Sequence, residues 1–366
     1  MFSDKLLSLL KRYEPSFYRL KELKRSGVSG ELSPQTIGMM FFALLKTFLV
    51  LLIGTFSGYF CQKLIKKNHW FTLESQKKIA ILLQKLGMIW LISITYTGSL
   101  WIFKIESLNK IISLPFVGLI AIIAGGYYAV MVCKHYHYSR INTGSMFSCG
   151  FFSNNVSLGG MICFFILGEE GYALVPIYTF FMRFLYYGLG YPIAHMYSGD
   201  FFKGKETVEK IIEVIKDPFF YLGVGAVVIG LVLNLSPYER PKIYATINEI
   251  LVPLSTFILL FSVGLNLKFS RVSEYIKECW FISTIKFIAV PATILVITLL
   301  LGYQSINQGL PLKVSLIMSA MPVAFNSVIA ANIYNLNIDL VNSCWIFTTF
   351  GILFVLPLLL FVVSLF

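Results

Sequence analysis

The segment Ser319-Ala-Met-Pro-Val-Ala-Phe-Asn-Ser-Val-Ile-Ala-Ala-Asn332 combines the apolar character of a membrane span with residues that disturb one. Pro322 has no amide hydrogen to donate and crowds the carbonyl four residues earlier, so the sequence predicts a helix break or kink here. A break inside a bilayer exposes backbone polar groups, which are tolerated only where protein or a water-filled cavity covers them. Interruptions of this kind mark the binding sites of many transporters. The alternative is a proline kink in an ordinary span, since proline is common in membrane helices.

The composition of the chain is that of a membrane protein. Of its 366 residues, 57% are hydrophobic and only 13% are charged, against about 25% charged residues in soluble domains. The mean hydropathy is +0.76. Apolar runs of roughly 20 residues, the length that crosses a bilayer as a helix, recur along the chain. We therefore predict an all-α polytopic protein that crosses the cell membrane several times.

The formal net charge of +12 does not indicate a nucleic-acid partner. The basic residues fall in short connections between apolar runs, which is typical of cytoplasmic loops that face anionic lipid. The partners expected are the lipid bilayer and a small-molecule substrate, and a homodimer is a further expectation. The six cysteines form no Cys-x-x-Cys pair, so they are interpreted as small buried hydrophobic residues, and no metal or cofactor is predicted.

Ten transmembrane helices are predicted, arranged as two repeats of five. Their approximate ranges are 37–61, 81–103, 111–133, 144–167, 172–197, 218–235, 243–267, 279–302, 312–335 and 340–365. The predicted organisation is a basic tail (1–36), a first repeat (37–197), a connector (198–217) and a second repeat (218–366), and an amphipathic surface helix is one alternative for the tail. Because five is an odd number, the two repeats would insert with opposite orientation, as in many secondary transporters.

Each predicted repeat has its interruption in the fourth span. In the first repeat the interruption reads Ser153-Asn-Asn-Val-Ser-Leu-Gly-Gly160, and in the second it is the segment around Pro322. Half-helix N-termini at such breaks offer free N–H groups and a positive dipole end to an anion. Amide and hydroxyl side chains there can orient a carboxylate, or they can simply cap the half-helices. The substrate-binding candidates at the breaks are Asn154, Asn155, Ser157, Pro322, Asn326 and Ser327.

Two basic residues lie inside predicted spans and away from the span ends, where a charged side chain is a functional hypothesis; Lys46 and Lys85 lie near span ends, where their side chains can reach the membrane surface. Arg183 falls near the middle of the fifth span and is a further candidate for binding a substrate carboxylate. It could instead form a structural pair with Glu169 or Glu170. Lys286 in the eighth span is a second candidate of the same kind.

Four stretches resemble the auxin efflux carrier family, which contains the plant PIN proteins and bacterial permeases for malonate or malate. They are Leu51-Leu-Ile-Gly-Thr-Phe-Ser-Gly-Tyr-Phe60, Phe152-Ser-Asn-Asn-Val-Ser-Leu-Gly-Gly160 with Leu167-Gly-Glu-Glu170, Lys216-Asp-Pro218 with Leu251-Val-Pro-Leu-Ser255, and Ala320-Met-Pro-Val-Ala324 with Thr348-Thr349. The likeness covers roughly residues 40–366. Family members commonly have a proline after the fourth-span glycine, where this chain has Gly159-Gly160.

The resemblance implies a fold and an activity. The fourth and ninth helices would cross at their breaks, and a scaffold and a mobile unit would give elevator-like alternating access. The substrate would be a small organic anion, moved by a secondary-active or potential-driven carrier, and a homodimer would form through the scaffold helices. A sodium-coupled carrier like the bile acid symporters is an alternative. A membrane-embedded acyltransferase that uses His135 and His137 is another, and we favour a carrier over an enzyme.

Overall fold

The computed structural model describes residues 34–68, 92–102, 111–198, 218–265 and 272–366, with a few single positions between 75 and 87. These parts of the chain are helical, and they contain one isolated β-bridge, between Ser153 and Val323. Most of the predicted basic tail and the connector 198–217 lie outside the described residues. The predicted all-helical class is confirmed for the parts that the structure describes.

Six helical segments in these ranges are long and apolar enough to cross a membrane. They are Phe41–Ile65, Leu114–His135, Asn155–Met196, Ile243–Gly264, Ile276–Leu300 and Ile338–Ser364. A shorter apolar helix covers Gly225–Leu235. The chain is therefore a multi-pass membrane protein, while the count of ten spans stays a prediction. Part of the difference arises because a helix broken in the middle gives two pieces that are each too short to cross alone.

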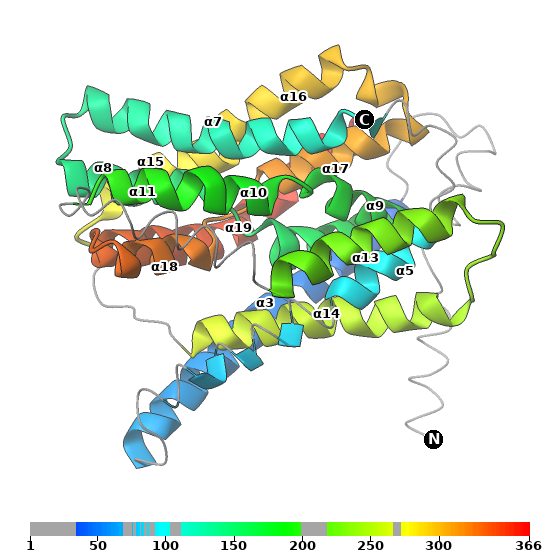
Figure 1. Ribbon diagram of the computed structural model, residues 1–366, viewed down its shortest axis with the longest axis horizontal. Helices are drawn as coiled ribbons and strands as arrows, with labels where there is room; N and C mark the ends of the chain where they lie inside the picture. Colours follow the sequence, from blue (N-terminus) through cyan, green and yellow to red (C-terminus); the bar gives the residue numbers. More distant parts are fainter. Residues whose placement is uncertain are drawn as a thin grey trace.

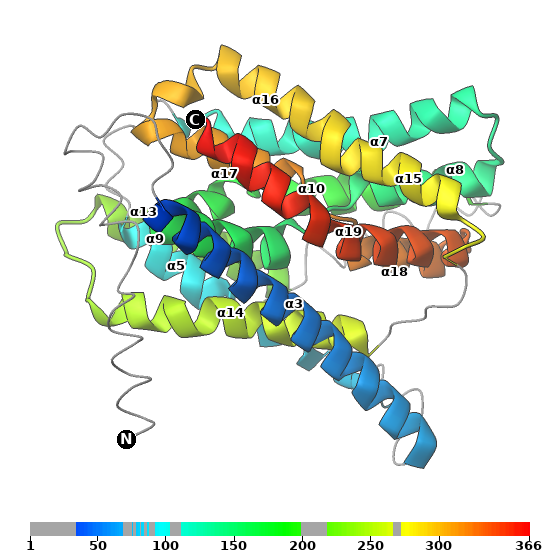
Figure 2. The same ribbon diagram turned by 180° about the vertical axis from the view of Figure 1, so that it is seen from behind.

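Four helices form a layer along one side of the molecule (Figures 1 and 2). This four-helix layer consists of α3 (Pro34–Asn68), α5 (Ile92–Ile102), α13 (Pro218–Leu235) and α14 (Ile243–Gly264). Helices α3 and α14 approach closely at Gly58 and Gly264, since a Cβ added to Gly58 would lie 2.2 Å from the carbonyl oxygen of Phe261. Small residues at a contact are how membrane helices bring their backbones together.

The remaining helices form a second group, the crossover bundle. It contains α7 (Leu114–His135), α8 (Arg140–Phe151), η2 (Asn155–Gly159), α9 (Gly160–Tyr178), α10 (Met182–Leu185), η3 (Tyr186–Gly190) and α11 (Tyr191–Met196). It also contains α15 (Ile276–Thr284), η4 (Ile285–Ala289), α16 (Val290–Leu300), α17 (Leu310–Ser319), α18 (Phe325–Ile333) and α19 (Ile338–Ser364). The short turns η5 (Tyr303–Ser305) and η6 (Asn307–Gly309) connect α16 to α17. In both views α7 and α16 lie on the side opposite α14, and the half-helices run between them.

Both predicted interruptions are present. The first helix stops at Phe151 and resumes as the π-helical turn that begins at Asn155. The second stops at Ser319 and resumes at Phe325, so that Pro322 lies in the extended segment between two half-helices. The prediction of a true break, rather than a kink in a continuous span, is confirmed at both positions.

The predicted boundary between the fourth and fifth spans, between residues 167 and 172, coincides with a break in α9. Gly168 leaves the helical region, at φ 69° and ψ −165°, so two helical pieces meet there. Glycine adopts this conformation without strain. The second piece continues to Tyr178, and the chain turns again at 179–181 before α10 begins at Met182. This second turn, inside the predicted fifth span, was not predicted.

Candidate functional site

The two breaks lie against each other and pair through their backbones. The N–H of Asn154 donates to the carbonyl of Pro322 at 2.9 Å, and the N–H of Ala324 donates to the carbonyl of Phe152 at 3.1 Å. These bonds satisfy backbone groups that a helix would otherwise pair internally, as a membrane interior requires. Residues almost 170 positions apart in sequence thereby form one compact centre, which we call the crossover.

A cavity of about 100 Å³ opens at the crossover. About 10–15 Å³ on the same measure accommodates one water molecule, so the space suits several waters or one small solute. Polar lining comes from both breaks, while α14 and α19 contribute mostly apolar side chains. The lining residues are Ser153, Asn154, Asn155, Val156, Ser157, Met182, Tyr186, Leu259, Leu260, Val263, Ala324, Phe325, Asn326, Ile329, Trp345 and Thr349.

Four of the seven predicted site residues line this cavity: Asn154, Asn155, Ser157 and Asn326. Asn154 accepts a hydrogen bond from the hydroxyl of Ser157. Asn326 donates to the hydroxyl of Tyr191 at 3.2 Å. Asn155 is 2% exposed, and its amide oxygen has no hydrogen-bond partner among the described residues. The amides therefore lie at the cavity with part of their hydrogen-bonding capacity unused, although Asn154 also stands at the N-terminal cap position of η2.

The other three predicted residues do not line the cavity. Pro322 is buried behind it and contributes its carbonyl to the backbone pairing. Ser327 is buried and donates to the carbonyl of Ala324 at 2.7 Å, which places its hydroxyl in the first turn of α18. Arg183 lies on α10 beside Met182, a lining residue, but is not itself part of the lining. A role for Arg183 in substrate binding stays a prediction.

Lys286 lies closer to the crossover than the sequence indicated. It is 1% exposed and lies on the π-helical turn η4. Its Nζ donates to the carbonyl of Gly150 at 2.6 Å, to the hydroxyl of Ser153 at 2.5 Å and to the carbonyl of Phe152 at 3.2 Å. The ammonium group therefore contacts the C-terminal end of α8, where the dipole of a helix is negative.

Aromatic residues of the crossover were not predicted from the sequence. The hydroxyl of Tyr186 accepts from the N–H of Ser153 at 2.8 Å and donates to its carbonyl at 2.9 Å. Tyr186 also packs edge-on against Phe152, with ring centroids 4.8 Å apart. Trp345 closes the cavity from α19. A tyrosine with a polar group in mid-span was the one available signal for Tyr186, and nothing local in the sequence distinguishes Trp345.

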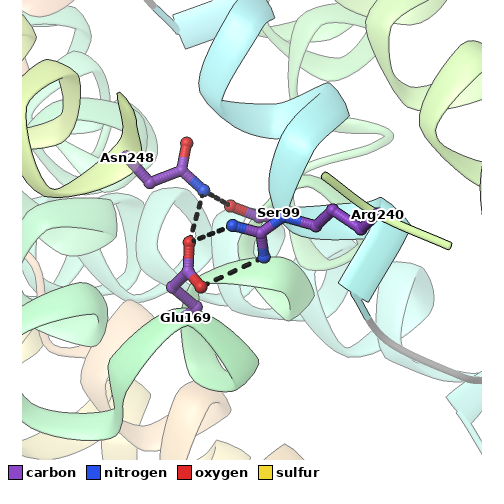
Figure 3. Close-up of polar contacts among 4 residues, drawn as sticks. All are labelled: Ser99, Glu169, Arg240 and Asn248. Carbon is purple, nitrogen blue, oxygen red and sulfur yellow. Dashed lines mark hydrogen bonds and ion pairs between the residues drawn. The ribbon is translucent and has the colours of Figure 1, made fainter. Parts of the chain in front are cut away.

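A second polar centre joins the crossover bundle to the four-helix layer (Figure 3). Arg240 makes a bidentate pair with the carboxylate of Glu169, at 2.8 and 3.1 Å. Asn248 on α14 donates to the same carboxylate at 2.8 Å and to the hydroxyl of Ser99 on α5 at 2.9 Å. The sequence had suggested Arg183 as a partner of Glu169 or Glu170; the structure pairs Glu169 with Arg240, which precedes α14. We call this group of four side chains the bridging network.

The fold and the crossover define the class of protein. Broken helices whose ends meet at a polar cavity inside a membrane-spanning bundle are the plan of a membrane transporter. Two relatives agree with this class, and both are named "uncharacterized transporter". One, from Methanothermobacter thermautotrophicus, is 24% identical over 215 residues, which cover 58% of this chain and 64% of the relative, so the chain spans slightly less than two thirds of that protein. The other, from Methanocaldococcus jannaschii, is 26% identical over 318 residues, covering 83% of this chain and 94% of the relative. No family model matches the chain.

Proposed function

We propose that the protein is a carrier of a small organic anion that binds at the crossover cavity in a cell membrane. The observation that carries this proposal is the meeting of two half-helix N-termini at one cavity. The half-helix that starts at Asn155 and the half-helix that starts at Phe325 both begin in its lining. The first N–H groups of a helix have no partner within the helix, and together with the positive partial charge of its N-terminus they favour a carboxylate.

The side chains around the cavity favour the same kind of ligand. Asn154, Asn155 and Asn326 each carry an amide that can donate to a carboxylate oxygen. The Nζ of Lys286 contacts Ser153, which is part of the lining, so a basic group lies directly behind the cavity wall. Charge in a site of low dielectric acts more strongly than in water. An anion of a few heavy atoms matches both this charge and the size of the space.

Alternating access would occur where the crossover bundle meets the four-helix layer. The cavity lies at that boundary, because α14 provides Leu259, Leu260 and Val263 to its lining. Apolar side chains form few directional bonds, so a wall of this kind can slide past the polar breaks. The likeness of the sequence motifs to auxin efflux carriers supports an elevator-like movement and the arrangement of the chain as two inverted repeats. The names of both relatives support transport in general.

The test is uptake of labelled carboxylates, malonate and malate first, by proteoliposomes that contain the purified protein. Asn326→Ala removes an amide that lines the cavity and should lower the uptake rate at least about tenfold, the effect of losing roughly 1.4 kcal/mol of binding to the transported ion. Asn332→Ala is the matched control, because Asn332 is an exposed residue of the same helix that donates to the carbonyl of Val328 within it. Its uptake should equal that of the wild type.

The same assay decides the remaining points. If no carboxylate of one to six carbons is taken up by the wild-type protein, the anion proposal is wrong. Equal losses in Asn326→Ala and Asn332→Ala would show that the effect comes from α18 as a whole and not from the cavity. Arg183→Ala tests the predicted arginine separately, and unchanged uptake would remove Arg183 from the site.

A further inference from the structure

Lys286 has the contacts of a bound cation. An ammonium group has three hydrogens to donate, and the three acceptors of Nζ are two backbone carbonyls and one hydroxyl, at 2.5 to 3.2 Å. No carboxylate belongs to this set. The side chain is 1% exposed, so the positive charge is stabilised by neutral oxygen atoms, as a metal cation is in a cage of carbonyl and hydroxyl ligands.

The position of these oxygens in the fold is equally specific. Gly150 and Phe152 lie at the C-terminal end of the half-helix α8, and Ser153 lies in the break itself. In transporters built from broken helices, unwound carbonyls and half-helix C-termini are the groups that coordinate Na⁺ or a proton. Lys286 reaches them from the π-helical turn η4, whose wider coil inserts an extra residue into the helix and is a feature frequently found at functional sites.

We propose that the ammonium of Lys286 is a built-in cation of the crossover, which occupies the place of a coupling metal ion and makes the carrier independent of Na⁺. The positive charge that stabilises the end of α8, and that attracts an anion to the cavity through Ser153, is then covalently attached to the protein. The inference rests on the proposed function only in calling the protein a carrier. The cation site itself follows from the contacts of Lys286.

The experiment measures the thermal stability of purified protein in detergent, which needs no knowledge of the substrate. Lys286→Ala removes three methylene carbons and the ammonium, and n-propylammonium has the same four heavy atoms. We expect the variant to lose at least about 5 °C in Tm, since several buried acceptors become unpaired. Millimolar n-propylammonium should restore at least half of that loss with a saturable concentration dependence. 1-Propanol, a neutral molecule with the same carbon chain, should restore none of it.

Two controls accompany this measurement. The wild-type Tm should be the same in NaCl, KCl and choline chloride at equal ionic strength, and a saturable rise in NaCl alone would overturn the proposal. Rescue by 1-propanol equal to that by n-propylammonium would also overturn it, because packing and not charge would then be the missing element. If Lys286→Ala does not fold, Ser153→Ala decides the question while keeping the lysine. It should lower the Tm measurably, and an unchanged Tm would show that the hydroxyl does not hold the ammonium.

Because the melting experiment contains no carboxylate, its outcome is separate from that of the uptake assay. If the melting results are as expected but no carboxylate is taken up, the cation site stands and the proposed substrate is wrong. If carboxylate uptake requires Na⁺, the proposed substrate stands and the proposal of a built-in cation is wrong.

Discussion

The buried lysine of the crossover and the Glu169–Arg240 pair of the bridging network are both charged groups inside a largely apolar protein, but they connect different parts of it. All three partners of Lys286 belong to the crossover bundle. The bridging network instead joins Glu169 of that bundle to Asn248 and Ser99 of the four-helix layer and to Arg240 beside it. A contact within one group of helices can persist while the groups move, whereas a contact between the groups has to break.

The two centres also differ in how completely their polar groups are hydrogen-bonded. The ammonium of Lys286 has as many acceptors as it has hydrogens. In the bridging network, Nε of Arg240 and the amide oxygen of Asn248 are buried without a partner among the described residues. The side chains of Arg240 and Glu169 also keep 7% and 20% of their surface exposed. A partly satisfied polar network stabilises less than a complete one. We therefore expect Lys286 to be a permanent part of the bundle and the bridging network to exist in one arrangement of the two groups.

The largest effect is expected from Lys286→Met. Methionine fills nearly the same space but cannot donate, so two buried carbonyls and a hydroxyl lose their partner at the end of α8. The free energy of unfolding should fall by about 3 kcal/mol or more. Lys277→Met, on the exposed first turns of α15, is the matched control. It loses contacts with the Tyr136 ring at 4.6 Å and the Phe281 ring at 5.7 Å, and a cost of about 0.5–1 kcal/mol is expected. Equal losses in the two variants would mean that the buried contacts of Lys286 stabilise the protein no more than those of an exposed lysine.

Substitutions in the bridging network are expected to lower the free energy of unfolding less than Lys286→Met does, and to change the conformation of the protein. Glu169→Gln and Arg240→Gln should each destabilise by about 1–2 kcal/mol, and a double-mutant cycle should give a coupling energy of at least about 1 kcal/mol. If the pair exists in only one arrangement, losing this energy shifts the populations about fivefold. The alkylation rate of a cysteine introduced by Leu260→Cys, on the α14 side of the cavity, should change by that factor.

The control for the alkylation measurement is Thr348→Val, which removes a hydrogen bond inside the crossover bundle and should leave the rate unchanged. Cys61 is replaced by serine in all variants, since it is the one thiol among the described residues that is not buried. A rate that is the same with and without Arg240 would show that the bridging network does not distinguish two arrangements.

Much of the crossover could be predicted from local sequence. Pro322 and the pair Asn154-Asn155 are unusual inside apolar runs, and the physics of a bilayer makes such residues informative even in a single sequence. The half-helices, the breaks and four lining residues followed from that signal. The turn at 179–181, inside the predicted fifth span, could not be predicted, because it is made by Thr179, Phe180 and Phe181, which look like a span.

The long-range contacts were beyond the reach of local patterns. Lys286 is 133 residues from Ser153, and Arg240 is 71 residues from Glu169. The sequence identified each as a charged or polar residue but gave no means of choosing its partner, so Glu169 was considered with Arg183. Side chains such as Tyr186 and Trp345 line the cavity because of how α10, η3 and α19 pack, and that packing depends on the whole bundle.

The smallest effect on the free energy of unfolding is expected from Thr348→Val, at the break around Pro322. Its size shows whether the break around Ser153 needs the charge of Lys286. The N–H of Val323 donates to the hydroxyl of Thr348 at 3.2 Å, so this break is supported by a neutral side chain where the first is supported by Lys286. Valine has nearly the same shape as threonine and leaves one buried N–H without its acceptor. The cost should be about 1 kcal/mol, measured by the same unfolding assay. The loss should therefore be about a third of that in Lys286→Met. If the two losses were equal, the charge of Lys286 would add nothing beyond a hydrogen bond. Because Lys286 has three acceptors and Thr348 accepts one N–H, a loss in Lys286→Met of more than three times that in Thr348→Val would exceed the count of hydrogen bonds and would assign the excess to the charge.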